Sequence, residues 1–241
     1  MCFTGATQNQ ALFDRATTAY NEGDYKKAVE NYLEILENGK HSAELYFNLG
    51  NSYYKLNEIA PSIYYYEKAL LLRPNDGEIK NNLAYSQNMT LDAIEQMPET
   101  GLSKIKKSTT GFLSFDQWAR VAVVFLILFV LLYIAFYYFR YSSRKRIAFI
   151  ASIVSLAVAI VSVVFAFIQY GDFKADRPAI VFSDEAIIKS EPNERRREVF
   201  TLHEGTKVNV LEELNNYHKI QIADGKTGWV PKESIKLLKD F

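Results

Sequence analysis

The sequence has few of the residues on which most enzymes and disulfide-stabilised domains depend. Its 241 residues include one cysteine, Cys2, and three histidines, so no disulfide can form within the chain. The histidines, His41, His203 and His218, do not have the spacing of known metal-binding motifs, and no phosphate-binding loop, dinucleotide fingerprint or nucleophile elbow occurs. We therefore predict a protein that is not an enzyme and that uses no metal and no cofactor.

Charge is missing from two long stretches in the second half of the chain. Val121–Phe139 and Ile147–Ile168 contain no Asp, Glu, Lys or Arg. A helix needs about 20 apolar residues to cross the hydrocarbon layer of a bilayer. The sequence therefore predicts transmembrane helices over 118–140 and 147–169 with a loop over 141–146, so both flanking parts emerge on the same side of the membrane.

Small residues recur along the second apolar stretch at spacings of three and four, which places them on one face of a helix. They are Ala148, Ser152, Ser155, Ala159, Ser162 and Ala166. Small side chains allow helix backbones to approach closely in lipid. We interpret this face as the contact for the bulky first helix; a dedicated interface for a partner helix is the alternative.

Positive charge between the two stretches predicts their orientation. Arg140, Arg144, Lys145 and Arg146 lie in or beside the loop, and short loops rich in lysine and arginine stay in the cytoplasm. We predict a multi-pass protein of the bacterial inner membrane, in contact with the lipid bilayer, with a cytoplasmic loop and both soluble domains in the periplasm. The parts outside the membrane are mildly acidic, so nucleic acid is not an expected partner.

This topology requires a translocation signal ahead of the first soluble domain. Met1–Ala6 is too short for the charged and apolar regions of a signal peptide. We expect a missing signal peptide upstream of this start. Its absence would favour the inverted topology or a cytoplasmic helical domain.

The first ninety residues contain an internal repeat. Asn9–Ser42 and Ala43–Asp76 align at an offset of 34 residues, which is the period of tetratricopeptide repeats. The second copy resembles that repeat closely over eight spaced positions, at one of which Ser62 stands in for the usual alanine. These are Tyr46, Leu49, Gly50, Tyr53, Ser62, Tyr66, Ala69 and Pro74. A third copy begins at Gly77, and we predict an all-α tetratricopeptide domain over 9–98.

The resemblance implies a concave groove that binds extended peptides. It places nine groove residues on the first helix of each repeat: Phe13, Thr17, Tyr20, Phe47, Asn51, Tyr54, Asn81, Tyr85 and Asn88. The asparagines would bond a peptide backbone beside aromatic side chains. The paired lysines that grip a carboxyl terminus are missing, which argues against a chaperone-tail receptor. The plainer alternative is that the aromatics pack and the asparagines are solvated.

Residues 99–117 are polar and read as a linker into the membrane. Ser114 stands three residues before Gln117, which is the capping-box spacing, so we expect the first membrane helix to begin there.

After Asp172 the sequence pattern changes to short runs of β-forming residues separated by turn-forming residues. A turn at Asp224–Gly225 is followed by Gly228-Trp229-Val230, and this ending resembles bacterial SH3-like domains. We predict a small all-β SH3-like barrel over 178–239 with Trp229 in its core.

The whole order of repeats, linker, membrane hairpin and SH3-like domain resembles the BatE members of the Bacteroides aerotolerance family. The resemblance implies a non-catalytic scaffold in an envelope complex tied to tolerance of oxygen or stress. Its implied partners are other envelope proteins, including membrane proteins with von Willebrand A domains and a MoxR-type ATPase. The alternatives are a cell-wall sensor that uses the SH3-like domain, and a wall hydrolase whose site is assembled from distant residues.

Overall fold

The computed structural model describes residues 3–94, 101, 109–193 and 197–239. The chain forms two compact units. One contains Met1–Met97 together with Arg177–Phe241, and the other contains Pro98–Asp176. Within the predicted linker over 99–117, residues 99–100 and 102–108 lie outside the described residues.

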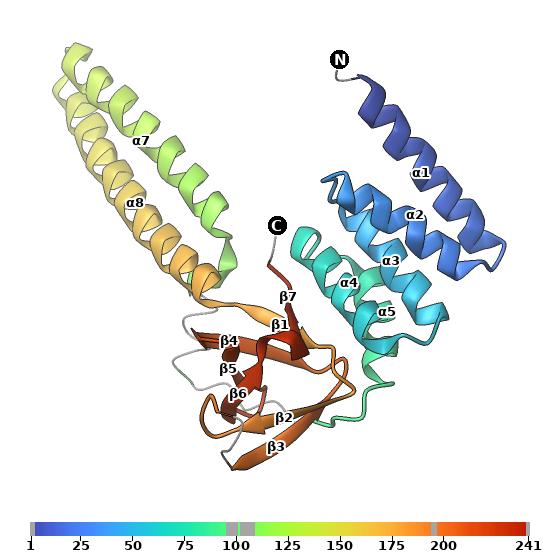
Figure 1. Cartoon of the computed structure of the whole chain (residues 1–241). Helices are drawn as coiled ribbons and strands as arrows, with labels where there is room; N and C mark the ends of the chain where they lie inside the picture. Colours follow the sequence, from blue (N-terminus) through green and yellow to red (C-terminus); the bar gives the residue numbers. More distant parts are fainter. Residues whose placement is uncertain (1–2, 95–100, 102–108, 194–196, 240–241) are drawn as a thin grey trace. The chain divides into compact units, whose positions relative to one another are not determined.

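Five helices of the first unit form the repeat array (Figure 1). They are α1 (Phe3–Asn21), α2 (Tyr25–Glu37), α3 (Ala43–Lys55), α4 (Ile59–Leu72) and α5 (Gly77–Gln87). Side chains of Asp24, Ser42 and Asp76 accept hydrogen bonds from backbone N–H groups in the first turns of α2, α3 and α5. These caps fix where each helix begins, because the first N–H groups of a helix have no partner within it.

Helices α3 and α4 cross closely at Gly50. A Cβ atom there would lie 2.6 Å from the ring of Tyr66, so any larger residue would push the helices apart. The Ser62 hydroxyl donates to the Gly50 carbonyl at 3.0 Å and lies 2.9 Å from the Ser86 hydroxyl. Serine therefore serves at a position where the repeat favours alanine, because its buried hydroxyl has partners.

The C-terminal part of this unit, residues 178–239, is all β, and we call it the β-domain. Its strands are β1 (Pro178–Val181), β2 (Glu185–Lys189), β3 (Glu198–His203), β4 (Lys207–Leu214), β5 (Tyr217–Gln221), β6 (Thr227–Pro231) and β7 (Ile235–Leu237). They form one antiparallel sheet in the order β3-β2-β6-β5-β4-β1-β7. Residues of all seven strands enter one core, so the sheet curls around it.

The motif that predicted the β-domain has clear structural reasons. Gly225 adopts φ +88° in the turn between β5 and β6, where glycine is favoured. A Cβ on Gly228 would collide with the Ile188 side chain, so glycine allows β6 to lie against β2. Trp229 is buried, as predicted.

The repeat array and the β-domain share a hydrophobic core. Ile180 and Leu238 of the β-domain are fully buried in the same cluster as Ile63 and Tyr64 of α4. The Tyr64 ring also lies 5.5 Å from the Phe182 ring in an edge-to-face arrangement. These two predicted domains are therefore packed together as one unit.

The second unit is a helical hairpin of α7 (Phe115–Tyr138) and α8 (Ser142–Ala175), preceded by the short helix η1 (Thr110–Phe112) (Figure 1). Ser114 and Gln117 form the predicted capping box. The helices run antiparallel, because Phe115 at the start of α7 contacts Phe173 near the end of α8.

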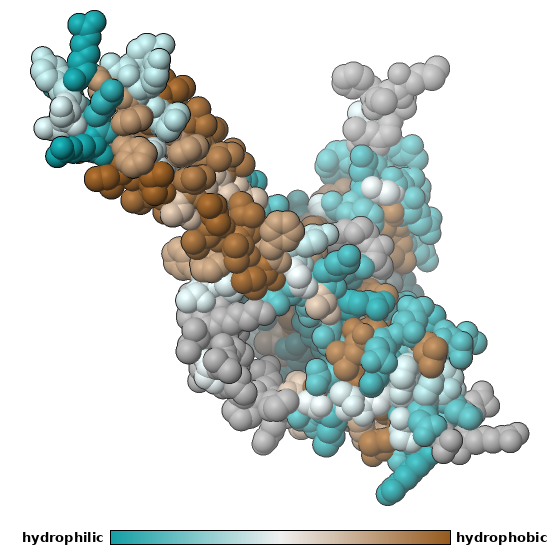
Figure 2. Space-filling model, turned by 90° about the vertical axis from the view of Figure 1, so that its left-hand side faces the viewer, coloured by the Kyte–Doolittle hydropathy of each residue, from teal (hydrophilic) through white to brown (hydrophobic). Residues whose placement is uncertain are grey.

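Both helices are long and apolar enough to cross a membrane. Figure 2 shows hydrophobic side chains gathered along the hairpin and hydrophilic ones at one end of it. Five of the predicted small residues on α8 are buried, namely Ala148, Ser152, Ser155, Ala159 and Ser162. The Ser155 hydroxyl donates to the Phe125 carbonyl of α7 at 2.7 Å, so the small face contacts the first helix.

The connection between the helices is shorter than the predicted loop over 141–146. Helix α8 begins at Ser142, so Arg144, Lys145 and Arg146 lie in its first turns and Arg140 precedes it. Its 34 residues span about 50 Å at 1.5 Å per residue, whereas the hydrocarbon layer is about 30 Å thick. We had equated the end of the apolar run with the end of the helix, but polar residues continue the helix beyond that run.

Candidate functional site

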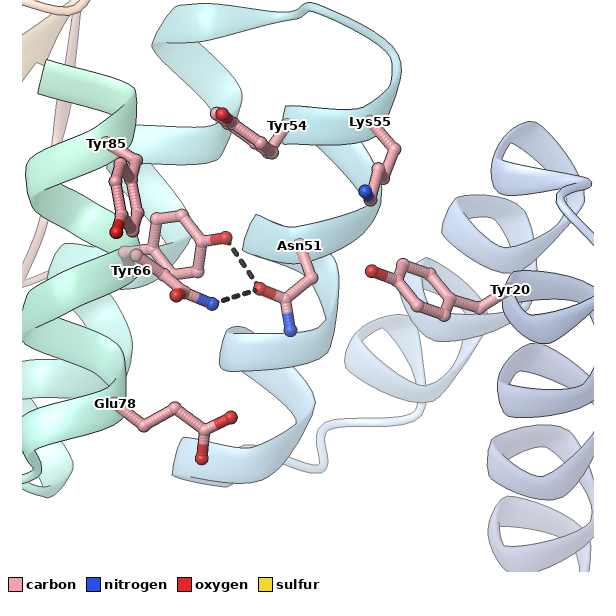
Figure 3. Close-up of a pocket in the computed structure, with 8 residues that line it drawn as sticks. Tyr20, Asn51, Tyr54, Lys55, Tyr66, Glu78 and Tyr85 are labelled. Atoms are coloured by element: carbon pink, nitrogen blue, oxygen red, sulfur yellow. Dashed lines mark hydrogen bonds between the residues drawn. The ribbon is translucent and has the colours of Figure 1, made fainter. Parts of the chain in front are cut away.

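A cavity of about 340 Å³ opens on the repeat array between α1, α3, α4 and α5 (Figure 3). Eight residues line it: Tyr20, Asn51, Tyr54, Lys55, Tyr66, Glu78, Asn82 and Tyr85. Four are tyrosines, one is a cation and one is an anion. The cavity therefore offers aromatic faces together with hydrogen-bonding groups, which is the chemistry that peptide-binding grooves use.

Asn51 lies at the centre of a hydrogen-bond network in this cavity. Its Oδ1 accepts from the Tyr66 hydroxyl at 2.6 Å and from Asn82 Nδ2 at 2.9 Å. Two donors on one oxygen assign the orientation of the amide. Its Nδ2 extends away from both donors (Figure 3) and has no acceptor among the described residues. The network therefore holds one N–H₂ group ready to donate to a ligand.

Burial favours the protonated form of Tyr66, which the network requires. Desolvation raises the pKa of the Tyr66 phenol, and the nearby Tyr20 raises it further. A tyrosine phenol is protonated at neutral pH in any case, and the raised pKa extends to higher pH the range over which Tyr66 donates to Asn51. Tyr20, on α1, has its own pKa raised, first by burial and then by Tyr25 and Tyr32.

Four of the nine predicted groove residues meet in this cavity, namely Tyr20, Asn51, Tyr54 and Tyr85. Thr17 does not line it, and its hydroxyl lies 3.1 Å from that of Tyr32. Phe13 lies 5.5 Å from the Tyr32 ring and lines a different cavity. Phe47 is half-buried, packs beside Tyr66 and lines another. The role of these residues in binding stays a prediction.

Two of the predicted asparagines lie elsewhere. Asn81 is exposed on α5 and does not line this cavity, whereas its neighbour Asn82 does. The repeat offset maps Asn81 onto Phe47, but the contact between α3 and α5 turns the next residue toward Asn51. Asn88 is exposed at the C-cap of α5 and does not line this cavity.

Sequence reasoning missed four lining residues: Lys55, Tyr66, Glu78 and Asn82. Tyr66 is on the second helix of its repeat, whereas we had placed all groove residues on the first helices. Asn82 stands 34 residues after Asn48, so the repeat offset alone could have proposed it.

The basic residues predicted to set the topology lie at one end of the hairpin unit. Arg140, Arg144 and Arg146 are exposed. The Arg144 guanidinium lies 5.3 Å from the centre of the Tyr141 ring, and Lys145 Nζ lies 5.6 Å from that of Phe136. This end of the hairpin is therefore cationic and aromatic, as membrane–water interfaces favour.

Comparisons with known proteins identify the two kinds of domain. Residues 43–76 match the tetratricopeptide repeat model, with the bounds of the predicted second copy, and residues 184–236 match the bacterial SH3 domain model. A comparison with curated proteins finds no match.

The matches define a class of protein rather than one activity. Tetratricopeptide and SH3 domains are typically non-catalytic modules that bind proteins or, for bacterial SH3 domains, cell wall. Among the described residues, no group of three or more histidine, cysteine, aspartate or glutamate side chains is arranged to hold a metal ion. The chain thus combines a tetratricopeptide array, a bacterial SH3 domain and two candidate membrane helices.

Proposed function

We propose that this protein is a non-catalytic membrane scaffold that binds an extended segment of a partner protein in the groove of its repeat array. The observation that carries the proposal is the Asn51 network. Its oxygen is held by two donors while its Nδ2 has no acceptor among the described residues. Asn51 lines an open cavity, and the carbonyl of a bound peptide would supply the acceptor that its Nδ2 lacks there.

The ligand that suits this cavity is an extended backbone rather than a small apolar molecule. Asn51 and Lys55 donate, Glu78 accepts, and the tyrosines do both. An extended peptide presents alternating carbonyl and N–H groups that match such a surface. Aromatic faces beside the polar groups provide apolar contact for its side chains.

The finer proposal follows the family resemblance. We place the protein in the bacterial inner membrane with both soluble domains in the periplasm and the basic end of the hairpin in the cytoplasm. Its partners would be envelope proteins of an aerotolerance complex, namely membrane proteins with von Willebrand A domains and a MoxR-type ATPase. The clustered basic residues at one end of the hairpin support this orientation.

Site-specific photo-crosslinking in native membranes tests the groove. A photoreactive phenylalanine analogue replaces Tyr54, which lines the cavity, or Glu30, which is exposed on α2. We expect a defined envelope protein to crosslink from position 54 and not from position 30. The Asn51→Asp variant should reduce that crosslink at least tenfold, because the carboxylate keeps the acceptor and removes the free donor.

Mass spectrometry of the crosslinked product tests the finer proposal. Recovery of a protein with a von Willebrand A domain would support the aerotolerance assignment. Equal crosslinking from both positions, or a product that the Asn51→Asp variant leaves unchanged, would contradict groove binding.

Reporter fusions test the membrane orientation. Alkaline phosphatase fused to either end of the chain should be active, because both ends are proposed to lie in the periplasm. An inactive fusion at the N-terminal end with an active one at the C-terminal end would overturn the hairpin topology.

A second function is favoured by the bacterial SH3 match over residues 184–236, since domains of this kind include cell-wall binders. The full chain in detergent, incubated with purified sacculi, would then sediment with them. Sedimentation that the Asn51→Asp variant does not change would assign the cell wall to the β-domain rather than to the groove.

A further inference from the structure

The carboxylate of Asp92 joins the end of the repeat array to the β-domain. Asp92 follows α5 and accepts three hydrogen bonds: from the His203 backbone N–H at 2.7 Å, from His203 Nδ1 at 2.7 Å, and from the Thr206 hydroxyl at 2.5 Å. Both donor residues belong to β3 and the β3–β4 turn. Hydrogen bonds to an ionised acceptor are about twice as strong as neutral ones.

An aliphatic side chain follows the carboxylate onto the same domain. Ile94, two residues after Asp92, packs against the core of the β-domain. Asp92, Ala93 and Ile94 lie beside Phe200–Leu202 of β3, and together they line a cavity of about 420 Å³. The segment therefore presents an acid and, two positions later, an aliphatic group to one edge of the sheet.

The turn between β3 and β4 is shaped for close approach. Gly205 adopts φ +83°, and a Cβ there would lie 2.9 Å from both Ile63 Cδ1 and Thr90 Cγ2. Any other residue at this position would be strained and would collide with the repeat array. The glycine thus allows the turn that carries Thr206 to reach Asp92.

The groups around His203 and Thr206, at the β3 edge of the β-domain, favour an acidic side chain. Besides Asp92, the charged group that acts on the imidazole is Glu185, which is directly opposite His203 on β2. The hydrogen bond to Asp92 is the largest cause that raises the pKa of His203, and the charges of Asp92 and Glu185 add to it while burial opposes it. Protonated imidazole, a backbone N–H and a hydroxyl are all donors, so an amide in place of the carboxylate would offer only one oxygen to three of them.

From these contacts we propose that the β3 edge of the β-domain, with His203 and Thr206 as donors, is a binding site for a short segment in which an acidic residue is followed two positions later by an aliphatic one. The occupant is this chain's own segment Thr90–Ile94, bound in cis. The repeat array and the β-domain then act as one body rather than as two independently tethered modules. A free β-domain would offer this site to another segment of the same chemistry.

Histidine NMR on the full chain in detergent micelles tests the contact, because the sequence has only three histidines. In the natural chain we expect the pKa of His203 to lie above 6.5 and to fall in the Asp92→Asn variant, with a residual rise from Glu185. The matched control is Asp14→Asn, since Asp14 is exposed on α1 and, among the described residues, its carboxylate bonds only Gln10. The Asp14→Asn variant should leave the pKa of His203 unchanged.

Complementation with a peptide tests the site itself. In a full chain carrying Asp92→Ala and Ile94→Ala, the acetylated and amidated pentapeptide of residues 90–94 should restore the raised pKa of His203 at a few millimolar, the effective concentration typical of a short linker. The same peptide with asparagine in place of its aspartate should not. The natural chain should ignore both peptides.

Each result decides the proposal. A His203 pKa that Asp92→Asn does not change would show that the contact is absent. The lowered pKa of His218, which burial causes, reports whether the double variant stays folded. If it stays folded but neither peptide changes the pKa of His203, or both change it equally, the β3 edge does not recognise the segment. Either outcome would overturn the inference.

Discussion

The repeat–β-domain unit contains two polar clusters built from similar groups, one of which has hydrogen-bonding capacity left for a ligand and one of which bonds only within the molecule. In the groove, Asn51 receives two hydrogen bonds and keeps a donor without a protein acceptor among the described residues. At the junction, Asp92 accepts three hydrogen bonds, and all three donors belong to His203 and Thr206 of the same molecule. The first cluster faces a cavity bordered by four helices, whereas the second joins two domains.

The comparison shows that polarity alone does not mark a binding site. A network prepared for an external ligand retains hydrogen-bonding capacity that the protein does not fill. In a network that stabilises the fold, donors and acceptors of the protein bond one another, as in the Asp92 cluster. Helix α4 connects the two, because its Tyr66 reaches the groove network while its Ile63 and Tyr64 pack with the β-domain.

The largest expected effect comes from forcing the junction apart. Gly205→Ala should lower stability by about 1–3 kcal/mol more than Gly23→Ala, which is the typical cost of overpacking. Both glycines have φ +83°, so backbone strain is matched, but only at Gly205 does a Cβ meet other side chains. Thermal unfolding of the full chain in detergent measures the difference. Equal losses for the two variants would mean that the close approach at Gly205 does not occur.

The groove network should separate folding from binding at one position. Asn51→Leu removes the acceptor and strands the Tyr66 hydroxyl and Asn82 Nδ2, at a cost of about 1–3 kcal/mol. Asn51→Asp keeps the acceptor and should stay within about 1 kcal/mol of the natural chain, while losing the groove crosslink. Thermal unfolding and crosslinking on the same preparations distinguish them. Similar destabilisation by both substitutions would remove the basis for a free donor.

A smaller effect is expected from the ion pair at the junction. Lys207 Nζ lies 2.7 Å from the Glu67 carboxylate; the Glu67 side chain is 10% exposed and that of Lys207 47%. Lys207→Met should cost about 1 kcal/mol, because it leaves a nearly buried carboxylate unpaired but the lysine was partly solvated. Lys219→Met, at the exposed pair with Glu212, is the control and should change stability by less than about 0.5 kcal/mol. The reverse order would contradict a packed junction.

The smallest effect is the pH dependence of the Asp92 contact. Burial raises the pKa of Asp92, but the hydrogen bonds from His203 and Thr206 outweigh it, so the pKa lies below its ordinary value of 3.8. Its stabilisation is present above pH 3.8 and is lost as pH falls through the lowered value. The pKa of His203 is raised above 6.5, so its stabilisation is present below 6.5 and is lost as pH rises through the raised value.

The unfolding temperatures of the natural chain and of Asp92→Asn should therefore differ most between about pH 4 and 6.5 and converge on either side. Thermal unfolding across that range measures this window. A difference that stays constant from pH 3 to 9 would assign the effect of Asp92 to packing rather than to charge.

Local rules in the sequence were sufficient for most of the fold. The 34-residue offset predicted the helices around Gly50, the uncharged runs predicted α7 and α8, and the Asp224–Gly225 turn with Trp229 predicted the β-domain. Each of these depends on periodicity or on a turn residue a few positions away. The start of α8 was misplaced because hydropathy reports where lipid ends, and helices continue past that point.

The candidate groove was only partly predictable for a related reason. The repeat offset placed Asn51, Tyr54 and Tyr85 together, but it chose Asn81 where the structure uses Asn82. One residue on a helix is a rotation of about 100°. The angle at which two helices cross decides which neighbour faces a cavity, and no local pattern records that angle.

By itself the sequence determined the elements, their order and the two apolar helices, because helix caps, glycine turns and apolar periodicity act over a few residues. Only the tertiary structure decided that Asp92 meets His203, 111 positions away in the chain, and that Ile63 shares a core with Ile180. Such contacts follow from the packing of whole surfaces, in which a single carboxylate or a missing Cβ becomes meaningful only once its partner is in place.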